Sequence, residues 1–185
     1  TYRHRPDRDA SLIIVGSGFA AAAAVIHLGH NGFAPSDILI IGPGTLGSGQ
    51  AYGCKADAFR LNVRADLQRL WPDHPDHFPQ WAKTHIEDPQ AKTHAGHFYR
   101  RADFARYVSA QLEAATGKNN LRQVPARVVD IRPAQQGWQV FCANGADYCS
   151  ARLLLAIGNP EPQWPIPNQF EDSSTLIRNP WRGDW

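Results

Sequence analysis

The feature that most constrains the fold is an apolar segment that ends in a glycine turn and continues into an alanine-rich stretch. Residues 12–15 read Leu-Ile-Ile-Val, residues 16–21 follow the pattern G-x-G-x-x-A, and residues 22–28 are mostly small and apolar. A buried strand, a tight turn and a closely packed helix produce this order. The helix N-terminus would offer free N–H groups and its positive dipole end to an anion. The pattern predicts a dinucleotide pyrophosphate site; the alternative is a glycine turn without a ligand.

Composition narrows the class of protein. The 185 residues suit a single domain, and a hydrophobic content of 43% with a net charge of +2 indicates neither disorder nor a polyanionic partner. The basic residues are scattered, so we expect no nucleic-acid binding. No membrane-spanning run or signal peptide is visible, and three cysteines without metal spacing indicate a reduced, cytoplasmic protein. The C-terminal stretch lacks a helix or strand pattern, which suggests that the chain is part of a longer protein.

The remaining periodicity predicts an α/β fold. We expect one domain over residues 11–160, with a flexible segment at 1–10, a helical insertion at about 62–116 and a tail at 161–185. A turn ends at Asp76, which we expect to cap the helix that follows. The strand–helix–strand unit at the start implies parallel strands joined by a right-handed crossover. Strands are expected at 12–15, 38–41, 124–131, 138–141, 147–151 and 153–157, and helices at 19–30, 65–70, 77–83 and about 102–115.

Several of these segments, taken in order, carry a family resemblance. The chain resembles the FAD/NAD(P)-binding domain of two-dinucleotide-fold flavoproteins. It looks closest to bacterial FAD/NAD(P)-binding proteins distantly related to N-hydroxylating monooxygenases. The resemblance implies a Rossmann-like three-layer fold with a central parallel sheet and a small β-meander. The matching residues are 14–19, the Gly-x-Gly-x-Ala-Tyr-Gly run at 47–53, Leu-Asn-Val at 61–63, 72–81, the Arg-x-x-Phe-x-x-Tyr run at 101–107, and 153–159.

The resemblance also implies where a cofactor would lie. The FAD pyrophosphate would meet the turn and helix start, the adenine would meet the backbone near Arg127 and Val128, and the flavin would lie towards the segments at 49–50 and 61–62. NAD(P)H is implied as a possible second cofactor. The cofactor-binding candidates are Gly16, Ser17, Gly18, Phe19, Ala20, Gly42, Thr45, Gly49, Gln50, Asn62, Val128 and Gly158.

One position departs from the family pattern. The second strand usually ends in an acidic residue that accepts hydrogen bonds from ribose hydroxyls, and Gly42 stands there instead. Such charge-assisted bonds are worth ~1.5–3 kcal/mol each, so affinity for the dinucleotide would fall unless Thr45 or Ser48 substitutes. No Arg or Lys occurs at 42–54, which disfavours a 2′-phosphate and hence NADP in this first site.

Other candidate sites are weaker. The pairs His74-x-x-His77 and His94-x-x-His97 lack a completing ligand at a known spacing, so no metal site is predicted. Cys54 has no nearby partner cysteine and is interpreted as an incidental thiol. Cys142 and Cys149 are offset across a hairpin turn, so we expect no disulfide between them. Trp71 and Trp81 could sit beside a flavin, but packing against helices is the better default.

The sequence therefore predicts an FAD-dependent, NAD(P)H-linked oxidoreductase, monooxygenase-like, or its FAD-binding portion. A non-catalytic dinucleotide-binding module or sensor is the alternative, and an NAD-dependent dehydrogenase is a weaker third. No residue stands out as a general acid or base, and neither substrate nor oligomeric state follows from the sequence.

Overall fold

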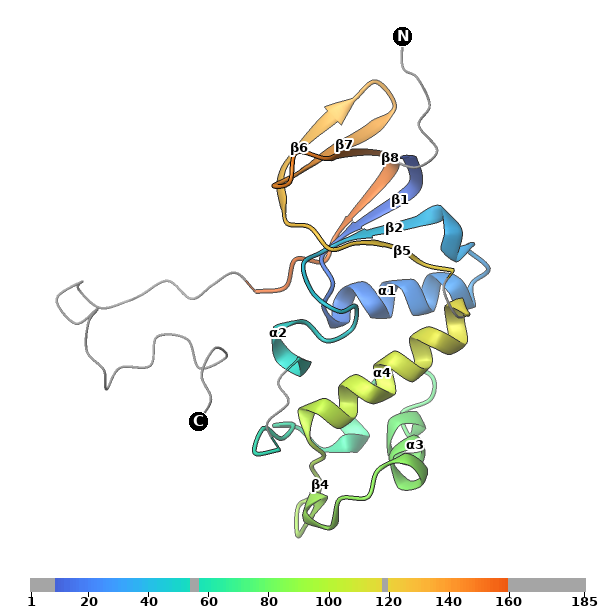
Figure 1. Ribbon diagram of the computed structural model, residues 1–185. Coiled ribbons are helices and arrows are strands. Elements are labelled where there is room, and N and C mark those ends of the chain that lie inside the picture. The colour runs from blue at the N-terminus through green and yellow to red at the C-terminus, as the bar shows by residue number, and fades with distance from the viewer. Residues whose placement is uncertain (1–8, 54–56, 118–119, 160–185) are drawn as a thin grey trace, which may run out of the picture.

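A computed structural model describes residues 9–53, 57–117 and 120–159 of the chain. Its main sheet has six strands in the order β5-β2-β1-β8-β7-β6 (Figure 1). The parallel part pairs β5, β2, β1 and β8, and the antiparallel part extends from β8 through β7 to β6. The strands are β1 (Asp9–Val15), β2 (Ile38–Ile41), β5 (Arg122–Val124), β6 (Val128–Ala134), β7 (Gly137–Cys142) and β8 (Asp147–Leu155).

Helices cover one face of the parallel strands, and a helical excursion extends away from the sheet (Figure 1). The helices are α1 (Phe19–His30), the single turn α2 (Gly49–Tyr52), α3 (His77–His85) and α4 (Arg101–Thr116). α1 packs along α4. The excursion also contains the short hairpin of β3 (Lys92–Thr93) and β4 (Gly96–His97) and the 3₁₀ turns η2 (Ala65–Leu67) and η3 (Pro89–Ala91). A further 3₁₀ turn, η1 (Pro35–Asp37), precedes β2.

The alternation of side chains along β1 and β2 builds three layers. Leu12, Ile14, Ile38 and Ile40 belong to the core shared with α1 and α4. The intervening residues Ile13, Val15, Leu39 and Ile41 belong to a second core, which also holds Val140 and Cys142 of the β-meander. A strand buried on both faces must be apolar throughout, which explains the uninterrupted hydrophobic runs. The expected helix–sheet–meander arrangement is confirmed.

Several predicted boundaries were wrong. The single strand expected at 124–131 is two strands, because Pro125 has no N–H to donate to a ladder and separates β5 from β6. The two strands expected at 147–151 and 153–157 are one continuous strand, β8, which pairs with β7 near its start and with β1 along most of its length. The sheet therefore runs unbroken from its parallel part into the meander.

Smaller corrections concern element ends. β1 already begins at Asp9, inside the segment expected to be flexible, while residues 1–8 lie outside the described residues. The helix expected at 65–70 is only the turn η2. α3 begins after Asp76 as expected, but that side chain makes no capping hydrogen bond. The proposed tail at 161–185 and Cys54 also lie outside the described residues. Cys142 and Cys149 are free thiols, in agreement with the prediction.

Candidate functional site

The glycine turn lies where the carboxyl ends of β2, β1 and β8 meet. Gly16 has a φ of 117°, and a Cβ placed on it would lie 2.1 Å from the carbonyl oxygen of Ala156, which follows β8. Its N–H donates to the carbonyl of Ile41 at 2.8 Å, which ties the turn to β2. Only glycine fits this conformation and this close approach. Open α/β sheets bind ligands at this edge, where the strand order reverses.

α1 presents its N-terminus at the same edge. Gly18 is the N-cap residue, and no side chain caps the helix there. The first N–H groups of a helix have no acceptor within the helix, so these groups are available to an anion. Beside Gly18 there is room: a Cβ placed on it would have only the Cα of Gly49, at 3.7 Å, as a neighbour within 4 Å. The geometry fits a group that approaches the backbone closely, as a pyrophosphate does.

The loop at 42–47 closes over the turn on the β2 side and uses Ser17 to do so. The Gly44 N–H donates to Ser17 Oγ at 3.2 Å, and the Gly47 N–H donates to the Ser17 carbonyl at 2.9 Å. The Gln123 side chain donates from Nε2 to the Gly44 carbonyl at 2.8 Å. Ser17 is buried as a result. The Ser17 hydroxyl therefore accepts a hydrogen bond from the loop at 42–47.

Gly42 is packed against the turn. A Cβ on Gly42 would lie 2.7 Å from the backbone nitrogen of Ser17 and 2.8 Å from both the Gly16 carbonyl carbon and Ser17 Cβ. Two of these three atoms belong to the backbone and the third is a Cβ, so none of them can move aside without a shift of the backbone. The missing carboxylate is therefore not a simple substitution, because this backbone leaves no space for any side chain at residue 42.

The single turn α2 forms the other wall, and aromatic packing and Arg101 hold it. Gly49 has a φ of 52°, and its Cβ would lie 2.8 Å from Gly18 Cα. The Tyr52 ring packs edge-on against Phe19 and tilted against Phe104, with centroids 5.7 and 4.9 Å apart. Arg101 Nη1 donates to the carbonyl of Ala51 at 3.2 Å. Burial raises the pKa of Tyr52, although a hydrogen bond with Gln68 and the charge of Arg101 act the other way.

Some of the predicted cofactor-binding residues lie at or beside the glycine turn, and others lie away from it. The turn residues contact Gly42 and Gly49 directly, while Ala20, Thr45 and Gln50 are exposed beside them. Phe19 turns its ring into the helical core, so it can contribute only its backbone. The contacts that fix the turn include neither Asn62, exposed in the excursion, nor Val128, half-buried at the start of β6. Gly158 is exposed just after β8, with a φ of 67°.

Three residues that support the site were not predicted as site residues. Ala156 contributes the carbonyl against Gly16, Gln123 holds the loop, and Arg101 holds α2. Arg101 belongs to the Arg-x-x-Phe-x-x-Tyr run that carries the resemblance, but the resemblance assigned it no role in the site. Ala156 lies in the matching segment at 153–159, which likewise indicated no role for it, and nothing in the sequence around Gln123 indicates its contact. Both contacts depend on how the strand ends are placed.

Other features of the described residues were also compared with the expectations. They hold no group of three or more His, Cys, Asp or Glu side chains placed to bind a metal. No helix among them is long and apolar enough to cross a membrane. Trp71 packs against the rings of His27 and His30, and Trp81 stacks on His85, so both tryptophans pack within the helical part.

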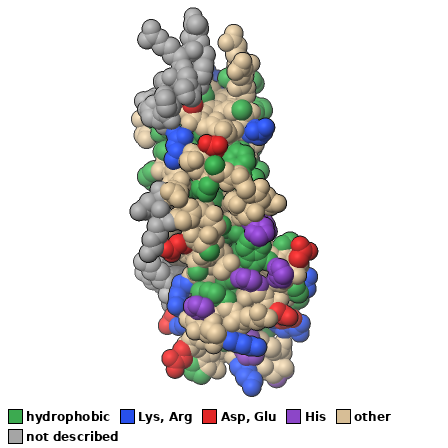
Figure 2. All heavy atoms as spheres, turned by 90° about the vertical axis from the view of Figure 1, so that its right-hand side faces the viewer, with side chains coloured by type: hydrophobic (Ala, Val, Ile, Leu, Met, Phe, Trp, Pro, Cys, Tyr) green, Lys and Arg blue, Asp and Glu red, His purple; other side chains and the backbone are tan. Residues whose placement is uncertain are grey.

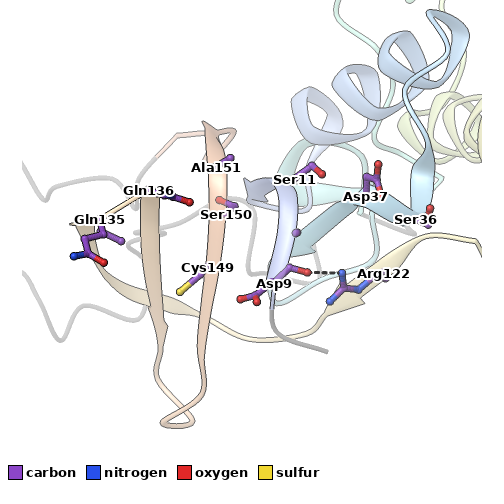
Figure 3. A pocket seen from close by; sticks show the side chains of 12 residues that line it. Asp9, Ser11, Ser36, Asp37, Arg122, Gln135, Gln136, Cys149, Ser150 and Ala151 are labelled. Carbon is purple, nitrogen blue, oxygen red and sulfur yellow. Dashed lines mark hydrogen bonds between the residues drawn. The ribbon is translucent and has the colours of Figure 1, made fainter. Parts of the chain in front are cut away.

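Figure 3 shows a pocket of about 570 Å³ elsewhere, at the amino ends of the parallel strands. Asp9, Asp37, Arg122 and Cys149 lie on its walls. Arg122 Nη1 donates to the Asp9 carbonyl at 2.8 Å across it. The amino ends face away from the edge at which such sheets bind their ligands, so this pocket is not the dinucleotide site.

Comparison with known proteins decides the family. A model of the family described as FAD-NAD(P)-binding matches residues 13–160. The chain belongs to this family. The match runs from β1 to the end of β8 and so includes the glycine turn, the loop, α2 and the meander. The protein is thus an FAD-NAD(P)-binding domain, as the resemblance predicted. No curated protein matches the chain.

Several solved structures share the fold of this FAD-NAD(P)-binding chain. Closed cyclohexanone monooxygenase is 14% identical with a TM-score of 0.59, and covers 86% of this chain and 28% of its own. The OTEMO complex with FAD and NADP is 18% identical with a TM-score of 0.55, covering 89% and 28%. A flavin-containing monooxygenase from Stenotrophomonas maltophilia is 14% identical with a TM-score of 0.54, covering 80% and 38%. The chain therefore spans well under half of each of these proteins.

Proposed function

We propose that this chain is the FAD-binding portion of an NAD(P)H-linked oxidoreductase. The observation that carries the proposal is the open space beside Gly18, bounded by Gly49 and facing the uncapped N-terminus of α1. That arrangement suits the pyrophosphate of a dinucleotide. The similar structures support the choice of cofactor, since one is a complex with FAD and NADP and another is a flavin-containing monooxygenase.

Each part of the site would hold a different part of the cofactor. Backbone N–H groups at the start of α1 would bind the pyrophosphate, with Gly18 allowing the close approach. The ribose next to the adenine would lie by the loop at 42–47, where the exposed Thr45 is the hydroxyl-bearing side chain nearest Gly42 in sequence. The backbone by Val128 would meet the adenine, and Gly49, Gln50 and Asn62 would lie towards the flavin.

The chemistry would come from the cofactor rather than from an acid or base of this chain. When bound, the flavin accepts a hydride from a reduced nicotinamide and passes the electrons to a further acceptor. The described residues would bind and orient it. The packing of Tyr52 between Phe19 and Phe104 would keep α2 beside a bound pyrophosphate.

Binding and reduction test the proposal in sequence. The purified 185-residue chain is incubated with FAD, NAD⁺ or NADP⁺, desalted, and its visible spectrum and residual nucleotide are measured. We expect FAD to be retained with flavin bands and the nicotinamide nucleotides to be lost. Retention of NAD⁺ with loss of FAD would contradict the proposal and favour a dehydrogenase.

A second candidate is a dinucleotide-binding module without turnover. The packing of Gly42 favours it, because the ribose carboxylate of related sites cannot be present here. Anaerobic addition of NADH or NADPH to the FAD-loaded protein separates the two. Bleaching of the visible flavin absorption, which reports reduction of the flavin, supports the oxidoreductase. A retained flavin that neither nucleotide reduces supports the module for this chain.

A further inference from the structure

A second pocket lies in the helical excursion, between α3, the turn η2 and the β3–β4 hairpin. Its volume is about 360 Å³, within the range of ~300–1,000 Å³ that holds small ligands. It shares no residue with the candidates for dinucleotide binding. Figure 2 shows His side chains over the lower half of one face, with Lys and Arg at its lower end. The lining residues are Arg64, Ala65, Asp66, Pro79, Lys83, Ala95, Gly96, His97 and Tyr99.

The inner part of this pocket is apolar and its walls are well fixed. Ala65 is 3% exposed and Tyr99 is 7% exposed. The stem of Arg64 lies across Gly96, since a Cβ there would be 2.8 Å from Arg64 Cδ. Gly96 has a φ of 127°, and its carbonyl accepts a hydrogen bond from Thr93 Oγ1 at 3.0 Å. The hairpin that supplies this wall is therefore held in one conformation by its own turn.

The charges around the pocket do not balance. Arg64 is paired with Asp66 through Nε at 3.1 Å and Nη2 at 2.8 Å, so these two charges largely cancel. Lys83 and His97 are exposed, and within the described part of the chain neither has an ion-pair or hydrogen-bond partner. The pocket therefore combines an apolar interior with one positive charge that is unpaired among the described residues, that of Lys83.

Tyr99 adds an independent observation. Its ring stacks on that of His97, with an interplanar angle of 17° and centroids 6.1 Å apart, and packs edge-on against Phe78. The hydroxyl makes no hydrogen bond to any described residue, although the residue is nine-tenths buried. Buried hydroxyls normally have a partner. Burial and the charges of Asp88 and Asp103 raise the pKa of Tyr99, so the phenol keeps its proton and can donate it.

We propose that this pocket binds a small organic carboxylate, with the anionic end at Lys83 and the Tyr99 hydroxyl and the apolar end against Ala65. A carboxylate accepts several hydrogen bonds at once, so it would satisfy both the Lys83 ammonium and the Tyr99 hydroxyl, which have no partner among the described residues. A short apolar body matches the interior better than water does. A neutral compound of the same shape would gain only the apolar contacts.

The test compares butyrate with butyramide, its neutral isostere, on the full chain in a low-chloride buffer without carboxylates. NMR titration follows the His97 ring protons, which report on this pocket and not on the glycine turn. We expect butyrate to bind at least ten-fold more tightly than butyramide. Lys83→Gln should weaken butyrate at least five-fold and leave butyramide unchanged. Arg132→Gln, which removes an exposed positive charge on β6 outside the lining, is the control and should change neither.

Either of two results would overturn the proposal. One is equal affinity of butyrate and butyramide at the His97 signals, or equal effects of Lys83→Gln and Arg132→Gln. The other is an absence of response at His97 while residues of the glycine turn shift, which would place the carboxylate at the N-terminus of α1. Because binding of FAD is measured separately, failure here leaves the proposed function unaffected.

Discussion

Gly42 and Ser17 are packed so closely that a Cβ on Gly42 would lie 2.7 Å from the Ser17 backbone nitrogen. This contact joins the end of β2 to the glycine turn and removes the space in which related proteins place an acidic side chain. The loop that follows is bonded to Ser17 through Gly44 and Gly47. The absence of the carboxylate is thus built into the backbone of this site.

Restoring the acidic residue should therefore harm the protein. Gly42→Asp forces apart backbone that cannot move easily, and overpacking of this kind costs ~1–3 kcal/mol. We expect a lower free energy of unfolding in urea and weaker FAD retention. Thr45→Asp, on the exposed part of the same loop, is the control and should change stability by less than ~0.5 kcal/mol. A Gly42→Asp variant of unchanged stability with tighter FAD binding would refute the steric account.

Gly49 tests the closeness of α2 to α1. Gly49→Ala places a methyl group 2.8 Å from Gly18 Cα at a residue with positive φ, whereas Gly32→Ala adds one at positive φ with nothing within 4 Å. The control should lose ~1–2 kcal/mol from backbone conformation alone. We expect Gly49→Ala to lose more and to bind FAD more weakly, measured by denaturant unfolding and flavin fluorescence. Equal losses in the two variants would mean that α2 does not press on Gly18.

Arg101 should stabilise the site, because its side chain holds α2 in place. Arg101→Gln removes the hydrogen bonds from Nη1 to Ala51 and from Nε to the Arg60 carbonyl. Hydrogen bonds from charged groups are worth ~1.5–3 kcal/mol, so we expect a loss of about 2 kcal/mol and faster release of FAD. Arg132→Gln is the control, since that side chain is exposed and pairs only at the surface. An Arg101→Gln variant that matches the control in both readouts would show that α2 needs no such support.

Asp88 should give the excursion an acid-sensitive contribution. Arg60 donates to both of its carboxylate oxygens, and this hydrogen bonding, with the charges of Arg60 and Arg100, lowers the pKa of Asp88. A carboxyl whose pKa is lower in the folded state stabilises the fold above its unfolded pKa, ~3.9, and loses that contribution as pH falls through the folded value. The contribution is therefore complete at neutral pH.

Urea unfolding between pH 2 and 7 checks this. We expect the stability difference between the wild-type protein and Asp88→Asn to be constant above about pH 5 and to shrink below pH 4. Asp130→Asn is the control: Arg132 likewise lowers the pKa of Asp130, but that pair is exposed and should contribute little. A difference for Asp88→Asn that does not change with pH would show that its ionisation is not linked to folding.

Local sequence patterns were sufficient to predict the fold, but they did not predict the contacts that hold the candidate site in place. The run at 12–15, the glycines and the alanines of α1 predicted the strand–turn–helix unit and its crossover to the parallel strand at 38–41. Pro125 was visible in the sequence, but its effect was missed, because the apolar residues on either side of it read as one strand. The contacts of Gly42 with Ser17 and of Gln123 with Gly44 depend on the relative placement of distant strand ends, which periodicity does not encode.

The pyrophosphate site at Gly18 is the central claim, and Gly18→Ala tests it most directly. A methyl group there meets only the Gly49 Cα at 3.7 Å, an ordinary contact, so the fold should lose no more than ~1 kcal/mol, from the poorer N-cap. The same methyl group occupies the space that the pyrophosphate needs. FAD affinity of the wild-type protein, Gly18→Ala and Gly44→Ala, another glycine with only a distant neighbour, should be measured by titration of flavin fluorescence. We predict at least a ten-fold loss for Gly18→Ala and little change for Gly44→Ala; FAD binding by a folded Gly18→Ala protein with wild-type affinity would contradict the account.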